Sequence, residues 1–251
     1  MTLTCSSPDG RSAYHSGQWG SDPLRPGGTE LTARAAELCG IRPGDRVLDL
    51  GCGCGHGALF LCQALDVDVI LVDLSPLACE LSMRRQPDAG VVCASASSLP
   101  FASSSMDAVI AECVLSVVAN PERALAECFR VLGEHGRLAI TDMYARNPEA
   151  IASLRALPQA CAAGMMVRAE LETELARQGF EIEVWEDHSR FLAEFVARFM
   201  MEHGSIERLW TGETNGEVAR QASRAMKDVR PGYFLLIARK RIAALNGGVQ
   251  P

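Results

Sequence analysis

The stretch from residue 47 to residue 57 reads Val-Leu-Asp-Leu-Gly-Cys-Gly-Cys-Gly-His-Gly. Its short apolar run predicts a buried strand that delivers one acid, Asp49, and then turns through glycines at every second position. Glycine tolerates positive φ and lets the backbone approach a bound molecule closely. The helix that we expect from Ala58 to Leu65 therefore begins at a turn suited to cradle a nucleotide-like ligand.

A second apolar run follows about twenty residues later. It covers Val69 to Val72 and ends in Asp73, whose carboxylate at a strand end is placed to accept hydrogen bonds from both hydroxyls of a ribose. Strand, glycine turn, helix, strand and acid together form half of a Rossmann unit. Because Gly53, Gly55 and Ala58 also fit a dinucleotide fingerprint, a nicotinamide dehydrogenase stays open on this segment alone.

The rest of the chain continues to alternate between strands and helices. The patterns predict further strands at residues 90–94, 107–113, 136–142, 180–185 and 232–239, and further helices at residues 29–39, 77–85, 121–132 and 167–179. Such a rhythm is typical of an α/β fold, with a mostly parallel sheet and helices on both faces.

Asp49 stands two residues before the first glycine, and this pattern resembles motif I of the class I S-adenosylmethionine (SAM) methyltransferases. The resemblance extends over about residues 46–144 and is to the small-molecule group that includes the ubiquinone/menaquinone and arsenite methyltransferases. It implies a Rossmann-like sheet whose last strand is antiparallel, SAM as the methyl donor and S-adenosylhomocysteine as the product. Its further motifs are Ser98-Leu99-Pro100-Phe101, Met106-Asp107-Ala108-Val109, the segment from Ala124 to Leu132, and Gly136-Arg137-Leu138.

The resemblance also implies which residues hold the cofactor. The glycine turn takes the methionine part of SAM, Asp73 the ribose, and Leu74 one face of the adenine. Where the family usually has an aspartate facing the adenine amino group, this chain has Ser95, so we expect weaker adenine recognition. The cofactor-binding residues implied in this way are Asp49, Gly51, Cys52, Gly53, Gly55, Asp73, Leu74, Ser95, Ala96, Glu112 and Cys113.

Methyl transfer from a sulfonium is an in-line displacement, which needs alignment and exclusion of water more than it needs an acid or a base. A thiolate, carbanion or amine acceptor requires only correct geometry, whereas a hydroxyl or phenol requires a base that takes its proton. The candidates for that base are Tyr14, His15, Glu112 and Tyr144, and the sequence does not single out one of them.

Composition restricts the classes of partner. The chain has 251 residues, of which 48% are hydrophobic and 22% charged, and a formal charge of −7 that does not attract nucleic acid or anionic membranes. No stretch approaches the roughly eighteen apolar residues of a membrane span. We therefore expect a soluble cytoplasmic protein. Its ten cysteines include no Cys-x-x-Cys pair, which favours reduced, mostly buried thiols over a metal site.

We expect four parts along the chain. Residues 1–45 form a loop and helix over the cofactor mouth, residues 46–187 the SAM-binding core, residues 188–231 a helical cap insert, and residues 232–251 the final strand and tail. In the insert Phe191, Phe195 and Phe199 recur at helical spacing. This apolar stripe packs on the sheet, lines the acceptor site, or meets a second copy of the chain in a homodimer.

The sequence thus predicts a SAM-dependent methyltransferase that acts on a small-molecule acceptor. One alternative is an arsenite- or thiol-type enzyme, because Cys161-Ala-Ala-Gly resembles a metalloid-binding segment of that group. No further cysteine follows Cys161, however, and soft metalloid capture needs two or three converging sulfurs. The other alternative is a non-catalytic SAM-binding sensor or assembly protein. The identity of the acceptor does not follow from the sequence.

Overall fold

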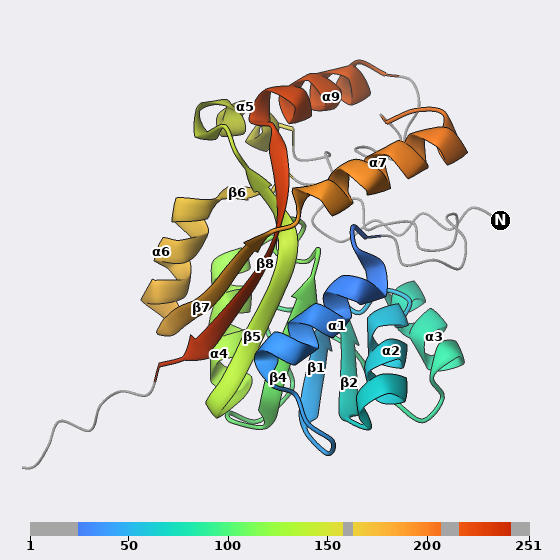
Figure 1. The fold of residues 1–251 in the computed structure, drawn as a ribbon, viewed down its shortest axis with the longest axis vertical. Helices are drawn as coiled ribbons and strands as arrows, with labels where there is room; N and C mark the ends of the chain where they lie inside the picture. Colours follow the sequence, from blue (N-terminus) through green and yellow to red (C-terminus); the bar gives the residue numbers. More distant parts are fainter. Residues whose placement is uncertain (1–24, 158–162, 207–215, 242–251) are drawn as a thin grey trace, which may run out of the picture.

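The computed structural model describes residues 25–157, 163–206 and 216–241, and its sheet has the strand order β3-β2-β1-β4-β5-β8-β7 with β6 beside β5 (Figure 1). The strands from β1 to β6 that pair with one another run parallel, and β8 runs antiparallel to both β5 and β7. This arrangement confirms the predicted fold class. The strands are β1 Arg46–Leu50, β2 Asp68–Asp73, β3 Gly90–Cys93, β4 Met106–Glu112, β5 Leu132–Ala145, β6 Met166–Val167, β7 Phe180–Asp187 and β8 Pro231–Lys240.

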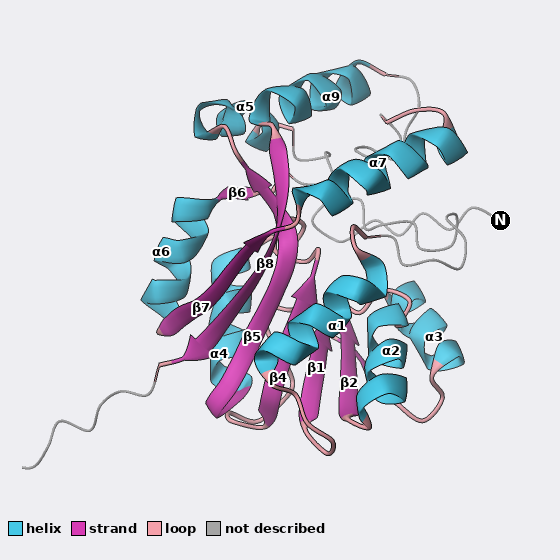
Figure 2. Cartoon of the chain, viewed as in Figure 1, coloured by secondary structure: helices cyan, strands magenta, loops and turns pink. Residues whose placement is uncertain are grey.

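Helices cover both faces of the sheet. Figure 2 shows α1, α2 and α3 on one side, here called the front face, and α4 and α6 on the other, the back face. The helices are α1 Gly28–Cys39, α2 His56–Leu65, α3 Pro76–Arg85, α4 Pro121–Val131, α5 Ile151–Arg155, α6 Arg168–Gln178, α7 Ser189–His203 and α9 Glu217–Val229, with a 3-10 turn, η1, at Pro148–Ala150.

Local chemistry explains where several helices begin and end. The Ser75 hydroxyl accepts a hydrogen bond from the Ala78 backbone at 3.2 Å, and proline follows it at the first helical position of α3. Helix α4 begins in the same way after Asn120. Helix α6 ends at Gly179, whose φ of 94° is left-handed and suits glycine. These boundaries lie within two residues of those that the sequence predicts.

Two cores fill the space between the helices and the sheet. The back-face core joins alternate strand residues to α4 and α6, and the front-face core joins the residues between them to α1 and α2. Leu48, Val109, Ile140, Phe234 and Leu236 belong to the back-face core, whereas Val47, Ile110, Ala139, Leu235 and Ile237 belong to the front-face core. The two-residue period of a strand therefore settles which face each strand residue meets.

The described parts of the predicted insert between β7 and β8 are mainly helical. Helix α7 starts two residues after the end of β7, and α9 ends two residues before β8 begins, so both lie beyond the carboxyl ends of the parallel strands (Figure 1). On α7, Leu192, Phe195 and Phe199 are buried. They belong to a third core, here called the cap core, together with Leu31, Met143, Met165, Ala222, Ala225, Met226, Val229 and Tyr233.

The structure adds elements that the sequence pattern does not show. Strand β5 is longer than the predicted residues 136–142 at both ends, and η1, α5 and β6 divide residues 148–167. Strand β6 is two residues long and exists because Met166 pairs with Tyr144, so no local periodicity announces it. In the described part of the chain, no helix combines the length and the apolar character that a membrane span requires.

Candidate functional site

A row of polar side chains crosses the front face near the carboxyl ends of four adjacent strands. Asp49 on β1, Glu112 on β4 and Thr141 on β5 follow one another, and Glu112 pairs in register with Thr141. Tyr233 on β8 continues the row beside Met143. All four are buried or nearly so, although each is polar. Parallel strands bind ligands at this end of the sheet, so the row marks the candidate site.

The glycine turn after β1 is packed on one side and open on the other. The Gly51 and Cys52 backbone N–H groups donate to the Val72 carbonyl at 2.7 and 3.0 Å, which ties the turn to β2. Gly51 has a left-handed φ of 70°, and a Cβ there would lie 2.5 Å from Val114 Cγ2. A Cβ on Gly53 would meet nothing within 4 Å. The open side of the turn is therefore available to a ligand.

Asp73 holds the turn and still has acceptor capacity. Its carboxylate accepts from the Gly53 backbone at 2.9 Å and from the Ser75 backbone at 2.8 Å. A carboxylate offers about four lone-pair directions, so capacity remains to accept from a ribose hydroxyl. Burial raises the pKa of Asp73, and hydrogen bonds from the backbones of Ser75, Gly53 and Leu74 oppose that rise. Next to it, Leu74 is 48% exposed, an apolar surface suited to one face of an adenine.

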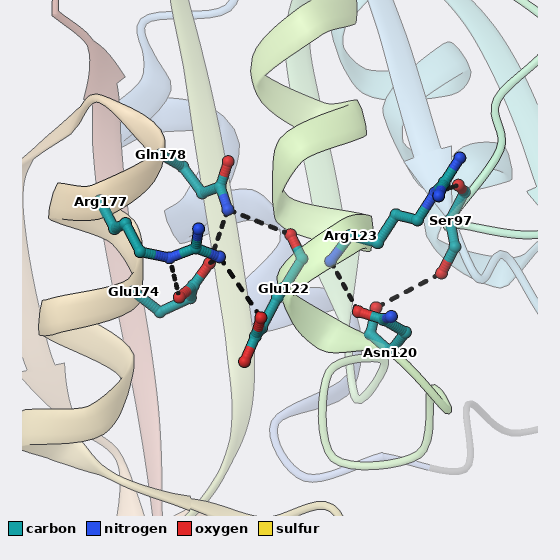
Figure 3. A network of polar contacts seen from close by, with 7 residues as sticks. All are labelled: Ser97, Asn120, Glu122, Arg123, Glu174, Arg177 and Gln178. Carbon is teal, nitrogen blue, oxygen red and sulfur yellow. Dashed lines mark hydrogen bonds and ion pairs between the residues drawn. The ribbon is translucent and has the colours of Figure 1, made fainter.

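Hydrogen bonds hold the loop that carries Ser95 and Ala96. The Ser95 hydroxyl accepts from the Ser97 backbone at 3.2 Å. Figure 3 shows Arg123, on the first turn of α4, donating to the Ser97 carbonyl at 3.0 Å, while the Ser97 hydroxyl donates to the Asn120 carbonyl at 3.3 Å. In the same view Arg177 of α6 contacts Glu122. The predicted adenine edge is thus held by the start of α4, and α6 contacts α4 there.

Arg25, which the sequence analysis did not identify, enters the row from the segment before α1. Its guanidinium lies 2.7 Å from Glu112 and donates to the Thr32 hydroxyl at 2.5 Å, and that hydroxyl donates to Glu112 at 3.1 Å. The Nε of Arg25 is buried and has no hydrogen-bond partner within the described ranges. The only signal in the sequence was a lone basic residue in the turn-rich stretch 23–28.

Asp49, Glu112 and Arg25 form a cluster, here called the cofactor cluster, whose charges do not cancel. Burial raises the pKa of Asp49 to about 7, Glu112 adds to the rise, Arg25 opposes it, and Asp73 raises it slightly further. Burial also raises the pKa of Glu112, against Arg25 and Thr32. Among the residues that the structure describes, two carboxylates face one guanidinium, so these residues leave the cluster short of a cation, and desolvated charges require partners.

The residues present fit SAM. Its ammonium group is the kind of cation that Asp49 lacks, and its carboxylate is the kind of acceptor that the free Nε of Arg25 lacks. Glycine at position 57 keeps this end clear, because a Cβ there would lie 3.1 Å from Glu112 and 3.5 Å from Asp49. The thiol of Cys52 points away from the opening, since it is buried and contacts Ser82, so Cys52 contributes through its backbone.

The four candidates for a general base have different outcomes in the structure. Tyr14 and His15 lie outside the described residues. Glu112 is engaged by Arg25 and Thr32 and belongs to the cofactor cluster. The expectation that Tyr144 lies at the mouth is wrong: strand alternation places it in the back-face core, where its hydroxyl donates to Asp187 at 2.6 Å.

Cysteines do not assemble a metal site in the described ranges. No group of three or more histidine, cysteine, aspartate or glutamate side chains there has an arrangement that holds a metal ion. The eight cysteines described are free thiols. Cys161 lies outside the described residues.

Comparisons of the sequence with known proteins identify methyltransferases as its relatives. Residues 48–140 match a family model described as a methyltransferase domain. An O-methyltransferase of Aspergillus nomiae is 34% identical over 160 residues, covering 58% of this chain and 71% of that protein. A demethylmenaquinone methyltransferase of Renibacterium salmoninarum is 35% identical over 123 residues, covering 49% of this chain and 52% of that protein. This chain spans about half the length of the demethylmenaquinone methyltransferases that it matches.

A solved structure extends the similarity over nearly the whole fold. The 4+2 cyclase SpnF matches with a TM-score of 0.70 and 26% sequence identity, covering 86% of this chain and 82% of that chain.

The packing of the glycine turn makes a prediction about stability. We expect Gly51→Ala to lower the free energy of unfolding by about 1 kcal/mol for its left-handed φ and by about 1 to 3 kcal/mol more for the clash with Val114. Gly40→Ala is the matched control, since Gly40 has a φ of 64° and open space around it. Urea denaturation of both variants measures the difference. Equal losses would show that Val114 moves aside without cost.

Proposed function

We propose a function on the basis of family membership, because the chain belongs to the class I SAM-dependent methyltransferases of the small-molecule group. The resemblance read from its motifs is thereby confirmed, and the cofactor of this family is SAM. We propose that this protein transfers the methyl group of SAM to a small-molecule acceptor. The observation that carries the proposal is the cluster of Asp49, Glu112 and Arg25 beside the open glycine turn, because its charges and free donor complement the amino-acid end of SAM.

Each part of the site has a defined task in this proposal. When bound, SAM supplies a methyl group on a sulfonium, which is its own leaving group. Asp49 accepts from the ammonium, Arg25 donates to the carboxylate, and Asp73 accepts from the ribose hydroxyls. Glu112 holds Arg25 in place. These contacts fix the position of the donor, and fixed alignment of donor and acceptor is the main contribution that this chemistry needs.

The remaining parts exclude water. We infer that α7, α9 and α1 cover the acceptor, as the predicted divisions 188–231 and 1–45 imply. Support comes from the position of α7 and α9 beyond the carboxyl ends of the strands and from Leu31 of α1, which packs in the same cap core. The free thiols of the described cysteines suit a reducing compartment, which supports the cytoplasm as the place of action.

The relatives favour this reading over the arsenite alternative. One relative is named for demethylmenaquinone, which is a small-molecule substrate. Another is named for O-methylation, which is a type of methyl transfer. A second candidate is favoured by the cyclase structure: a protein of this fold that catalyses a reaction other than methyl transfer. The two candidates differ in the fate of the cofactor.

A transfer assay separates these candidates. The purified protein is incubated with SAM labelled in its methyl group and a small-molecule extract of cells. We expect label in the small-molecule fraction and an equal amount of S-adenosylhomocysteine, because the sulfonium methyl is consumed in each turnover. Asp49→Asn serves as the control for background transfer. Recovery of all SAM unchanged from a protein that binds it would favour the second candidate.

The acceptor capacity of Asp73 predicts a loss of SAM affinity in its variants. We expect Asp73→Ala and Asp73→Asn each to weaken binding by about 1.5 to 3 kcal/mol, because hydrogen bonds to a charged group are lost. Asparagine is no milder here, since its NH₂ would face one of the N–H groups of Gly53 and Ser75. Calorimetry measures the effect, with Asp68→Asn at the exposed start of the same strand as control. Unchanged affinity in a folded Asp73 variant would remove Asp73 from the site.

The raised pKa of Asp49 predicts that binding depends on pH. Asp49 has a pKa of about 7 in the free protein, and an ammonium beside it favours its ionised form. Affinity for S-adenosylhomocysteine, which keeps the amino-acid end, should therefore fall about tenfold from pH 8 to pH 6, with protons released on binding below pH 7. Asp49→Asn should be weaker at pH 8 and flat across this range. A wild-type affinity that does not change would place the ammonium away from Asp49.

A further inference from the structure

Two polar side chains lie on the buried face of α3, where a helix that packs on a sheet usually carries apolar residues. Ser82 belongs to the last turn of the helix, and Gln86 directly follows its end. Ser82 is 0% exposed and Gln86 is 7% exposed. Polar groups buried to this degree persist because they are hydrogen-bonded, so their partners indicate what they do.

The partners of both side chains lie in the glycine turn after β1. The Ser82 hydroxyl donates to the Gly53 carbonyl at 2.8 Å, and the side-chain amide of Gln86 donates to the Gly55 carbonyl at 3.0 Å. The Gly55 carbonyl also accepts the first hydrogen bond of α2, from the Leu59 backbone at 3.0 Å. The turn is thus bonded to the end of α3 through its carbonyl groups.

Arg85 adds a third contact of the same kind. Its guanidinium donates to the Cys54 carbonyl, so three successive carbonyls, from residue 53 to residue 55, bond to one helix end. Residues 82, 85 and 86 share one face of α3, because positions three and four apart in a helix are neighbours. The end of α3 therefore holds the second half of the turn, whereas Val72 and Asp73 hold the first half.

The turn depends on such support because its backbone is unusually free. Gly51, Gly53 and Gly55 all have positive φ, and glycine loses more conformational freedom on ordering than any other residue. Glycine at position 55 also permits the close approach of α3, since a Cβ there would lie 3.1 Å from the Ser82 hydroxyl oxygen. A site that is already ordered spares its ligand the cost of ordering it.

Helix α3 also connects the two halves of the proposed cofactor site. It begins after Ser75, whose backbone N–H donates to the Asp73 carboxylate at 2.8 Å. Its other end holds the carbonyls of Gly53 and Gly55. The proposed ribose acceptor therefore lies at one end of α3, and the turn that receives the methionine part of SAM in this proposal lies at the other.

We propose that Ser82 and Gln86 are positioning residues for the methyl donor, which hold the glycine turn in the shape that receives the amino-acid end of SAM. This inference rests on the proposed function and adds two residues to it. Both side chains are buried, so they act through the turn. Loss of either donor leaves a turn carbonyl without its side-chain partner, and the cofactor then has to order the turn when it binds.

The test compares two ligands of the full chain by calorimetry. S-adenosylhomocysteine has the amino-acid end, whereas methylthioadenosine has the same adenine, ribose and thioether without it. We expect Gln86→Met, which keeps the length of the side chain and removes its donor, to weaken S-adenosylhomocysteine about tenfold and methylthioadenosine by less than about twofold. Ser82→Ala should lower the ratio of the two affinities in the same direction.

Ser105→Ala is the matched control and should leave both affinities unchanged. The Ser105 hydroxyl donates to the Ala102 carbonyl at 2.7 Å just before β4, at the opposite end of the sheet from the glycine turn. The control thus removes a hydrogen bond from serine to a carbonyl without touching the proposed site.

The ratio of the two affinities separates positioning from a purely structural role. Folded variants that bind both ligands as the wild type does, or that lose both affinities equally, overturn the inference. If Gln86→Met does not fold, Ser82→Ala decides by the same ratio. Wild-type protein that binds S-adenosylhomocysteine but not methylthioadenosine also overturns it, because the Asp73 half of the site then holds no ligand by itself. If the wild type binds neither ligand, the proposed function fails instead.

Discussion

Two carboxylates buried side by side impose the constraint on which this site depends. Asp49 and Glu112 project from adjacent strands onto the same face, and neither is accessible enough for water to satisfy it. A pair of this kind persists only with compensating charge and hydrogen bonds. Arg25 and Thr32 provide part of the compensation, and the shortfall of one positive charge defines what the site can receive. Under the proposed function, the preference for SAM is thus an electrostatic consequence of how β1 and β4 end.

The same constraint links the amino-terminal part of the chain to the sheet. Arg25 and Thr32 lie before and within α1, and both reach Glu112 across the front face. Helix α1 also contributes Leu31 to the cap core and Ala35 to the front-face core. One helix therefore contacts the cofactor cluster, the sheet and the cap. Removal of the charge on Glu112 would affect all three, because the position of α1 is coupled to that carboxylate.

A single backbone conformation separates the charged cluster of the site from the cap core. Glu112 belongs to the charged cluster, and the next residue, Cys113, belongs to the cap core. Only the left-handed φ of Cys113 allows two successive residues to lie on one face of the sheet. Thr141 and Tyr233 stabilise this conformation from β5 and β8. The change from a charged to an apolar environment thus occurs within one residue.

The sequence by itself determined the parallel sheet, the glycine turn, and the acids Asp49 and Asp73, because strand period, glycine spacing and strand-end carboxylates are local features of the chain. It also located the helical insert through the spacing of its phenylalanines. Only the tertiary structure decided that Arg25, Thr32 and Tyr233 join the site, since strands and a helix far apart in the sequence bring them together. It also decided that Tyr144 lies on the back face and Cys113 on the front, because strand alternation has to be counted from residues whose face is known. Pairing and register are long-range properties, and no short window of sequence contains them.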